Sequence, residues 1–319
     1  MIRSAQGFTR AGVLIVLAVI LLPVAAGLLL IHSVAQPPVD HESSDPADFL
    51  LRAEEIDLLS SDGVRLAGWY VAGRPDRAPI ILCHDLGKSR SSLLSTAVVL
   101  SGAGFPVLLF DFRRHGASGA AASTFGVTER LDLLAAIDFL GQRADGGAGA
   151  IGAWGIGMGA YAVALAATER PELAVLALDA LYPDVPAEID RRLRERLPPP
   201  LRPLVPAARL LYNLYFLAPL RRHAMVDRLD ALAGRSVLLI SGSDSPQRRD
   251  QGRALYEALP ESPQGNKNLL ELERSGADEL YAADRREYDT RITEFFTTYL
   301  SQDREGGDRP DGKIEVLER

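Results

Sequence analysis

The stretch Ala150–Ala162, AIGAWGIGMGAYA, decides the fold of this 319-residue chain. A short apolar run leads into glycines at every second position, and a segment with helical character follows. This order predicts a strand, a sharp turn centred on Gly157 and a helix. A dinucleotide-binding fingerprint would instead read G-x-G-x-x-G after the first strand of the fold. We therefore interpret the glycines as a structural turn and not as a phosphate-binding loop.

Apolar segments alternate with helical patterns on both sides of this turn. Eight segments are expected to form strands, and they lie at 54–60, 64–73, 78–84, 105–112, 150–155, 172–180, 236–242 and 267–273. The first two flank Ser61-Asp62-Gly63, which is typical of a hairpin turn. Apolar strands that alternate with helices predict an α/β fold with a mostly parallel sheet covered on both faces.

The segment 184–230 interrupts this alternation, because it contains no strand-like run. It holds a proline-rich stretch at 197–206, an apolar helical pattern at 207–220 and eight arginines between positions 191 and 222. We interpret it as a helical cap insertion whose apolar face packs on a cleft and whose arginines are solvated. In the alternative, the arginines and the apolar helix rest on anionic lipid headgroups.

The composition excludes several classes of function. A net charge of −7 argues against nucleic-acid binding, because no overall basic field gathers phosphates. The single cysteine, Cys83, excludes an intramolecular disulfide and is expected to be a buried, inert thiol. Five scattered histidines, without CxxC or HExxH motifs, favour neither a metal site nor a cofactor.

The uncharged stretch 11–31 is long enough to cross a bilayer, which needs about 20 apolar residues. Arg3 and Arg10 precede it, and the residues that follow are acidic. The positive-inside bias therefore predicts a single-pass protein of the cell membrane, with a cytoplasmic tail at 1–10 and an extracytoplasmic (periplasmic) domain.

A cleaved signal peptide is the alternative to an anchor, since Ser33-Val34-Ala35 has the small residues of a cleavage site. The apolar run is longer than that of a usual signal peptide, which favours the anchor. The polar residues 32–50 are predicted to be a flexible linker, and 301–319 a disordered tail.

Several motifs in their order along the chain resemble the α/β-hydrolase fold. They read APIILCHDLGKSRSSLL, LLFDFRRHGASG, TFGVTERLDLLAAIDFL, IGAWGIGMGAYAVALAA and VLLISGSDSPQRRDQGRALYEAL. They are most similar to the bacterial serine hydrolases of this fold, which include esterases, thioesterases and peptidase-like proteins. The resemblance covers about 54–300 and implies a domain at 51–300 with an eight-stranded sheet and a cap insertion at 184–230. It also implies a nucleophile at the turn after the strand 150–155.

The catalytic positions that the resemblance implies hold residues that cannot do the chemistry. The nucleophile position is Gly157, in a G-x-S-x-G pattern that has lost its serine. The acid position is Ser245, or Asp244 with a shift of one residue. The histidine position is Ala277, or Asp278 with such a shift, and the sequence has no histidine after His223.

The resemblance also implies an oxyanion hole, formed by the amides of Leu86 and Met158. Relatives carry glycine after the histidine of the first loop, whereas this chain has Asp85 after His84. An ionised Asp85 near these amides is expected to oppose the negative charge that develops during acyl transfer.

These losses predict a pseudo-hydrolase, which would bind a small apolar or acyl ligand or a protein partner without catalysis. The alternative is an active hydrolase of carboxylic ester or acyl substrates that uses displaced residues such as His84, His115 or Asp244. That alternative needs a serine and a histidine about 2.6–3.2 Å apart. His84 and His115 are otherwise expected to hold loops in place.

Overall fold

The computed structural model describes most of the chain, namely residues 5–39, 44–143, 149–206, 211–212, 215, 224–243, 246–261, 265–273 and 282–300. The chain divides into two compact units. The larger consists of Pro38–Val185 with His223–Arg319 and contains the sheet. The smaller consists of Met1–Pro37 with Pro186–Arg222 and contains the N-terminal helix.

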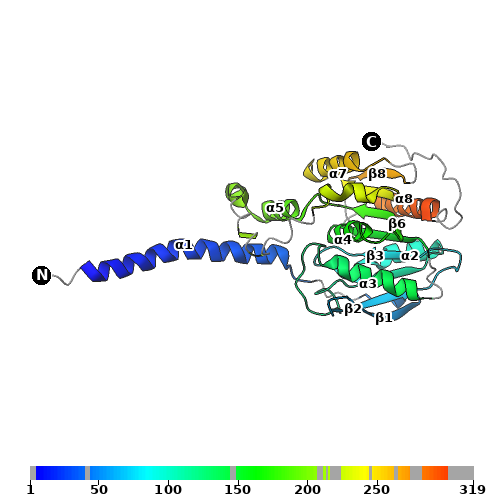
Figure 1. Cartoon of the computed structure of the whole chain (residues 1–319), viewed down its shortest axis with the longest axis horizontal. Helices are drawn as coiled ribbons and strands as arrows, with labels where there is room; N and C mark the ends of the chain where they lie inside the picture. The colour runs from blue at the N-terminus through cyan, green and yellow to red at the C-terminus, as the bar shows by residue number, and fades with distance from the viewer. Residues whose placement is uncertain are drawn as a thin grey trace. The chain divides into compact units, whose positions relative to one another are not determined.

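The larger unit is built on one eight-stranded sheet with the strand order β1-β2-β4-β3-β5-β6-β7-β8 (Figure 1). The strands are β1 (Ala53–Leu59), β2 (Arg65–Val71), β3 (Ile80–Cys83), β4 (Val107–Phe110), β5 (Ile151–Ile156), β6 (Leu173–Asp179), β7 (Ser236–Gly242) and β8 (Lys267–Leu272). Only the pairs β1–β2 and β2–β4 are antiparallel. All eight expected strands are present, so the predicted mostly parallel sheet is confirmed.

The hairpin between β1 and β2 forms where the turn signal predicts it. Gly63 has φ +86°, a conformation that glycine adopts at no steric cost. The amide of Ser60 donates to Val64 O at 2.9 Å and closes the turn. The two strands then pair from Leu59 with Arg65 to Ala53 with Val71.

Helices cover both faces of the sheet. Helices α2 (Leu94–Gly102) and α8 (Ala282–Leu300) share one buried cluster with alternate strand residues, for example Ile80 and Leu82 of β3. The intervening β3 residues Ile81 and Cys83 are also fully buried but point to the other face, because successive strand side chains alternate. That face carries α4 (Met158–Ala167), which packs on β5 and β6 and against α3 (Glu129–Gln142). Burial raises the pKa of the Cys83 thiol, as expected for an inert cysteine.

Three short 3₁₀ helices and one further α-helix complete the described part of the larger unit, namely η1 (Pro46–Phe49), η2 (Arg90–Leu93), η5 (Val226–Leu232) and α7 (Pro246–Ala258). Element η1 lies inside the predicted flexible linker 32–50. It is ordered by Asp45, whose side chain accepts from the Ala47 amide at 2.8 Å, and by Asp48, which accepts from the Asp45 amide. These local bonds give part of the linker a defined turn, which its polar composition does not reveal.

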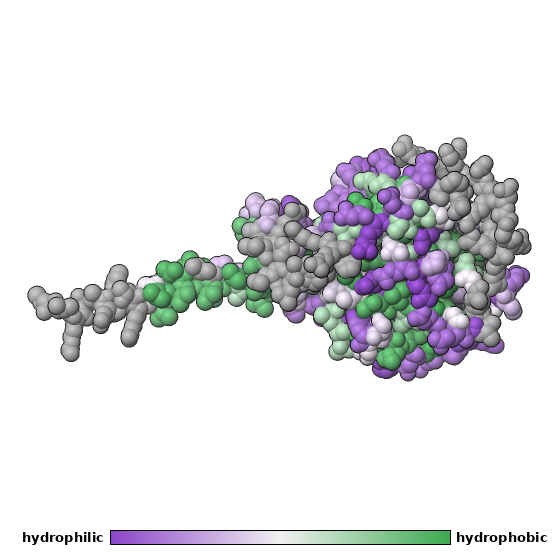
Figure 2. All heavy atoms as spheres, in the orientation of Figure 1, coloured by the Kyte–Doolittle hydropathy of each residue, from purple (hydrophilic) through white to green (hydrophobic). Residues whose placement is uncertain are grey.

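The smaller unit contains α1 (Ala5–Ala35) and, from Pro186 on, most of α5 (Val185–Arg196), followed by η3 (Pro199–Leu204). The stretch Gly12–Ala35 of α1 is long and apolar enough to cross a membrane. Figure 2 shows hydrophobic side chains along α1, and many of them are exposed. The helix is longer than the predicted span 11–31, since it begins at Ala5 and ends at Ala35. Its ends include polar residues such as Gln6 and Ser33.

The structure divides the predicted cap insertion 184–230. Residues Pro186–Arg222 group with α1, whereas η5 belongs to the larger unit. Buried Leu229 and Leu232 explain the placement of η5, which packs against α4 and α7. Most of the predicted apolar helix 207–220, the predicted tail 301–319 and His223 lie outside the described residues.

Candidate functional site

The turn from β5 into α4 has the shape that the sequence predicts. Gly157 has φ +51° and ψ −109°, a left-handed conformation that costs a residue with a side chain about 1–3 kcal/mol. Its amide donates to Asp179 O at 2.9 Å, and its carbonyl accepts from the Tyr161 amide at 3.0 Å. We call this strand-to-helix turn, with Gly157 at its centre, the elbow.

The last glycine of the pattern serves close packing. A Cβ atom on Gly159 would lie 2.3 Å from Cys83 O, at the end of the neighbouring strand β3. Only glycine therefore lets the first turn of α4 lie directly against the end of β3. This approach brings the loop after β3 to the elbow.

Asp85 of that loop fills the elbow. Its Oδ1 atom accepts a hydrogen bond from the Met158 amide at 2.8 Å. A Cβ atom placed on Gly157 would lie 2.2 Å from the same oxygen and 2.6 Å from Asp85 Cγ. The carboxylate thus takes the space in which the side chain of a nucleophile would begin. It also engages the amide that follows the nucleophile position, which is an oxyanion-hole donor in this type of turn.

Backbone bonds hold Asp85 in this position. Its carbonyl accepts from His84 Nδ1 at 2.8 Å and from the Lys88 amide at 3.1 Å. Gly87, two residues on, donates its amide to His115 Nε2 at 3.0 Å. The loop is therefore fixed by groups on both sides of Asp85, and its side chain is directed to Met158.

His84 and His115 are structural residues in this arrangement. His84 Nε2 accepts from the Phe112 amide at 3.0 Å, so Nδ1 carries the proton and donates to the Asp85 carbonyl. His115 Nδ1 donates in the same way to Arg113 O at 2.8 Å, while Nε2 accepts from Gly87. Burial lowers the pKa of both imidazoles to about 4. Both rings are neutral, and backbone groups occupy all four ring nitrogens, so neither is positioned to activate a serine.

A buried polar chain lies at the end of β6, next to the elbow. Asp179 Oδ2 accepts from the Tyr288 hydroxyl at 2.8 Å, and that hydroxyl accepts from Trp154 Nε1 at 3.0 Å. Burial raises the pKa of Tyr288 far above its ordinary value, and the negative charge of Asp179 raises it further. An aspartate at the end of a strand often orders the next turn, but the sequence contains no signal for its partner Tyr288, which lies 109 positions away.

Asp111, the residue after β4, orders both the turn that follows it and the loop after β3. Its Oδ1 accepts from the Arg90 amide at 2.7 Å, and its Oδ2 accepts from the Ala117 amide at 2.9 Å. A carboxylate that accepts from two backbone amides stabilises loop geometry. Asp111 therefore positions the loops beside the elbow.

The remaining predicted site residues are placed only in part. Leu86 is buried in the loop beside Asp85, and Met158 begins α4. The acid and histidine positions, Ser245 and Ala277, lie outside the described residues, as do the shifted candidates Asp244 and Asp278. Their assignment stays a prediction. Among the residues that the structure describes, no group of three or more His, Cys, Asp or Glu could hold a metal ion.

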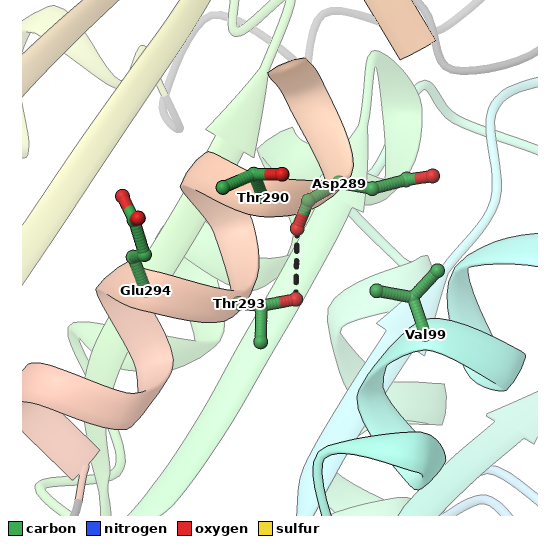
Figure 3. Close-up of a pocket in the computed structure, with 5 residues that line it drawn as sticks. All are labelled: Val99, Asp289, Thr290, Thr293 and Glu294. Atoms are coloured by element: carbon green, nitrogen blue, oxygen red, sulfur yellow. Dashed lines mark hydrogen bonds between the residues drawn. The ribbon is translucent and has the colours of Figure 1, made fainter. Parts of the chain in front are cut away.

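A surface pocket between α2 and α8 is separate from the elbow. Figure 3 shows its lining, with Val99 from α2 and Asp289, Thr290, Thr293 and Glu294 from α8. Thr293 Oγ1 donates to the Asp289 carbonyl at 2.7 Å, so this hydroxyl is engaged by its own helix. No elbow residue lines the pocket, and its polar groups do not form a catalytic arrangement.

No known family profile matches the chain. The sequence is 28% identical over 174 residues to the uncharacterised protein Rv2307c of Mycobacterium tuberculosis, covering 52% of this chain and 61% of that protein. It is 26% identical over 245 residues to the uncharacterised protein YqkD of Bacillus subtilis, covering 75% and 77%. The chain thus spans less than two thirds of the first relative and about three quarters of the second.

The structure is similar to the esterase Pf2001 of Pyrococcus furiosus. The TM-score is 0.63 at 20% sequence identity, and the match covers 83% of this chain and 99% of the esterase. Together with the sheet order and the elbow, this similarity establishes that the chain has an α/β-hydrolase fold. The fold that the sequence motifs predict is therefore confirmed.

Proposed function

We propose that this protein is a non-catalytic member of the α/β-hydrolase fold that acts by binding. It would bind a small apolar or acyl ligand, or a protein partner. The observation that carries the proposal is the Asp85 carboxylate, which lies in the space of the missing nucleophile and accepts from Met158.

The chemistry of acyl transfer explains why this arrangement argues against catalysis. Gly157 has no side chain that could attack a carbonyl carbon, and loss of a serine nucleophile costs about 10⁶ in rate. The Met158 amide already donates to a carboxylate, so an oxyanion would have to displace a negative group. Loss of one oxyanion donor costs a further 10²–10³, on the order found in a serine protease.

The alternative function is hydrolysis of carboxylic ester or acyl substrates by displaced residues. His84 and His115 do not support it, because backbone groups occupy their ring nitrogens. His32 Nδ1 is hydrogen bonded to the Tyr215 hydroxyl at 2.8 Å. This alternative therefore depends on His32, on His41, on His223 or on a base other than histidine.

Ester hydrolysis by the full-length protein in detergent tests the proposal. We expect no release of p-nitrophenol from its acetate or butyrate ester above the rate without protein. The variant Asp85→Gly, which clears the elbow, is expected to be equally inactive because it supplies no nucleophile. A rate above background that disappears on replacement of one serine would establish the alternative function.

We further propose that α1 is retained as a single-pass anchor, with the N-terminus in the cytoplasm and the sheet domain outside it (periplasmic). The apolar length of α1 and the arginines at positions 3 and 10 support this topology. Contacts of Ser33 with Arg196 also support retention, since cleavage after Ala35 would remove them. We expect the chain to resist carbonate extraction with its N-terminal residues present. A soluble chain that begins near Gln36 would indicate a signal peptide.

A further inference from the structure

The last turns of α1 contact the end of α5 and the segment that follows it in the smaller unit. Arg196 Nη1 donates to Ser33 O at 2.8 Å and to Ser33 Oγ at 3.1 Å. His32 Nδ1 and the Tyr215 hydroxyl are hydrogen bonded at 2.8 Å. A Cβ atom on Gly27 would lie 2.4 Å from Leu211 Cδ1, so the glycine lets Leu211 pack on the helix.

Element η3 starts three residues after Arg196, so its first residue lies within about 11 Å of the Arg196 backbone. None of its residues is buried. Leu201 and Leu204 are 44% and 58% exposed. Its prolines make this segment stiff, and it therefore presents two leucines next to the end of α1.

Apart from Arg196, the arginines between positions 191 and 202 fall into two groups. Arg191 and Arg192 donate to the buried carboxylate of Glu188, each at 2.5 Å from Oε1. Burial alone would raise the pKa of Glu188, but the two guanidinium groups hold it at about 2. These charges are compensated within α5. Arg194 and Arg202, by contrast, are exposed and lie on either side of the start of η3.

We infer that η3 with Arg194 and Arg202 forms a surface that binds anionic phospholipid at the membrane from which α1 emerges. Leu201 and Leu204 enter the boundary between headgroups and acyl chains, and the two guanidinium groups bind lipid phosphates. This inference rests on the proposed role of α1 as an anchor.

Geometry favours a bilayer over a soluble partner as the occupant. If α1 spans the hydrocarbon core, its residues near Ser33 lie at the headgroup level. The segment that contacts these residues must then lie at the same level. Tyr215 at this contact suits that place, because tyrosine is enriched where a membrane meets water. Exposed leucines beside exposed arginines are the composition of an interfacial segment.

Depth-dependent quenching tests this inference with the full-length chain in vesicles. The variant Leu204→Cys is labelled with an environment-sensitive NBD group, and the buried native Cys83 is protected from labelling. The matched control is Leu59→Cys on β1, where the native side chain is 70% exposed. Vesicles contain phosphatidylcholine with or without phosphatidylglycerol, plus lipids that carry a nitroxide quencher. Flotation and carbonate extraction of the same samples report on the anchor.

We expect the label at position 204 to be quenched and blue-shifted, and more so with phosphatidylglycerol, while the label at 59 stays unquenched. Reversal of both charges, Arg194→Glu with Arg202→Glu, should remove the dependence on phosphatidylglycerol. The inference is wrong if an inserted chain shows no quenching at 204, equal quenching at both positions or no dependence on anionic lipid. A blue shift without quenching would also contradict it, because the label would then contact this chain or a second copy and not lipid. Chain that is not inserted at all contradicts the anchor itself, which flotation distinguishes.

Discussion

The Asp85 carboxylate and the Met158 amide are joined by a hydrogen bond of 2.8 Å at the elbow of this α/β-hydrolase fold. The acceptor sits where an active hydrolase would place the first atoms of its nucleophile, next to Gly157. The glycine at position 157 and the aspartate at position 85 complement each other, because a side chain at 157 would collide with the Asp85 carboxylate. The hydrogen bond between Asp85 and Met158 thus stabilises the elbow. The same hydrogen bond blocks the place where a nucleophile and an oxyanion would have to lie.

Removal of the Asp85 side chain should weaken the fold without creating activity. We expect Asp85→Ala to lower the free energy of unfolding by about 1–3 kcal/mol, because the Met158 amide loses a charged acceptor. Asp85→Asn keeps an acceptor oxygen and should lose less. Chemical denaturation of the three proteins measures this order, and equal stability of all three would show that the hydrogen bond contributes nothing.

A side chain at the centre of the elbow should be destabilising for two separable reasons. Gly157→Ala imposes a left-handed backbone, at about 1–3 kcal/mol, and a collision with Asp85. In the double variant with Asp85→Gly the collision disappears, so the two effects should deviate from additivity by about 1 kcal/mol or more. Gly141→Ala in α3, with nothing within 4 Å of the added Cβ, is the matched control and should be neutral or slightly stabilising.

Strict additivity of Gly157→Ala and Asp85→Gly in a thermodynamic cycle would contradict the proposed collision. It would mean that the loop after β3 moves away at no cost when position 157 acquires a side chain.

The polar chain through Tyr288 should contribute to stability. Tyr288→Phe removes the hydroxyl that bridges Asp179 and Trp154, and we expect a loss of about 1.5–3 kcal/mol because the carboxylate is fully buried. Tyr256→Phe, on a partly exposed ring that faces Lys267, is the control and should change stability by less than about 0.5 kcal/mol. Similar thermal shifts for the two variants would argue against the bridge.

The two buried histidines should make the fold sensitive to acid. Their pKa values are about 4 in the folded chain and about 6.5 in the unfolded chain. Between these values the unfolded state binds more protons, so the free energy of unfolding rises with pH through this window. The stabilising effect of the two neutral histidines is complete above about pH 6.5 and decreases as the pH falls toward 4, because the unfolded chain then binds protons that the buried rings do not.

Denaturation curves at about pH 5, inside the window between the two pKa values, and at about pH 7, above it, measure this dependence. The variant His115→Asn should show a smaller difference between the two conditions than the wild type. The explanation is wrong if His115→Asn shows the same difference between the two conditions as the wild type, since the neutral histidines would then contribute nothing to it.

The sequence predicts the sheet well because each strand carries its own local signal. Runs such as 78–84 and 236–242 are apolar throughout and bounded by turn residues, and β3 and β7 form inside them. The elbow is equally local, since Gly157 and Gly159 follow a strand and precede a helix. Element η1 escapes prediction because its order comes from side-chain bonds within a polar stretch.

The sequence predicts which catalytic groups the site lacks. It does not predict that the Asp85 side chain occupies the place of the nucleophile. The sequence shows that Gly157 cannot be a nucleophile and that Asp85 replaces a glycine. The direction of the Asp85 side chain depends on hydrogen bonds between the imidazoles of His84 and His115 and the backbone of the loop, and such geometry leaves no periodic pattern. The bond between Tyr288 and Asp179 is unpredictable for the same reason.

Labelling with a serine-reactive fluorophosphonate tests the central claim most directly. The full-length protein is incubated with the probe, and the intact mass is measured beside that of an active serine esterase. Because the elbow holds Gly157 and the Asp85 carboxylate, we predict no increase in mass for this protein and complete labelling of the esterase. A single stoichiometric adduct that is lost when one serine is replaced by alanine would contradict the account.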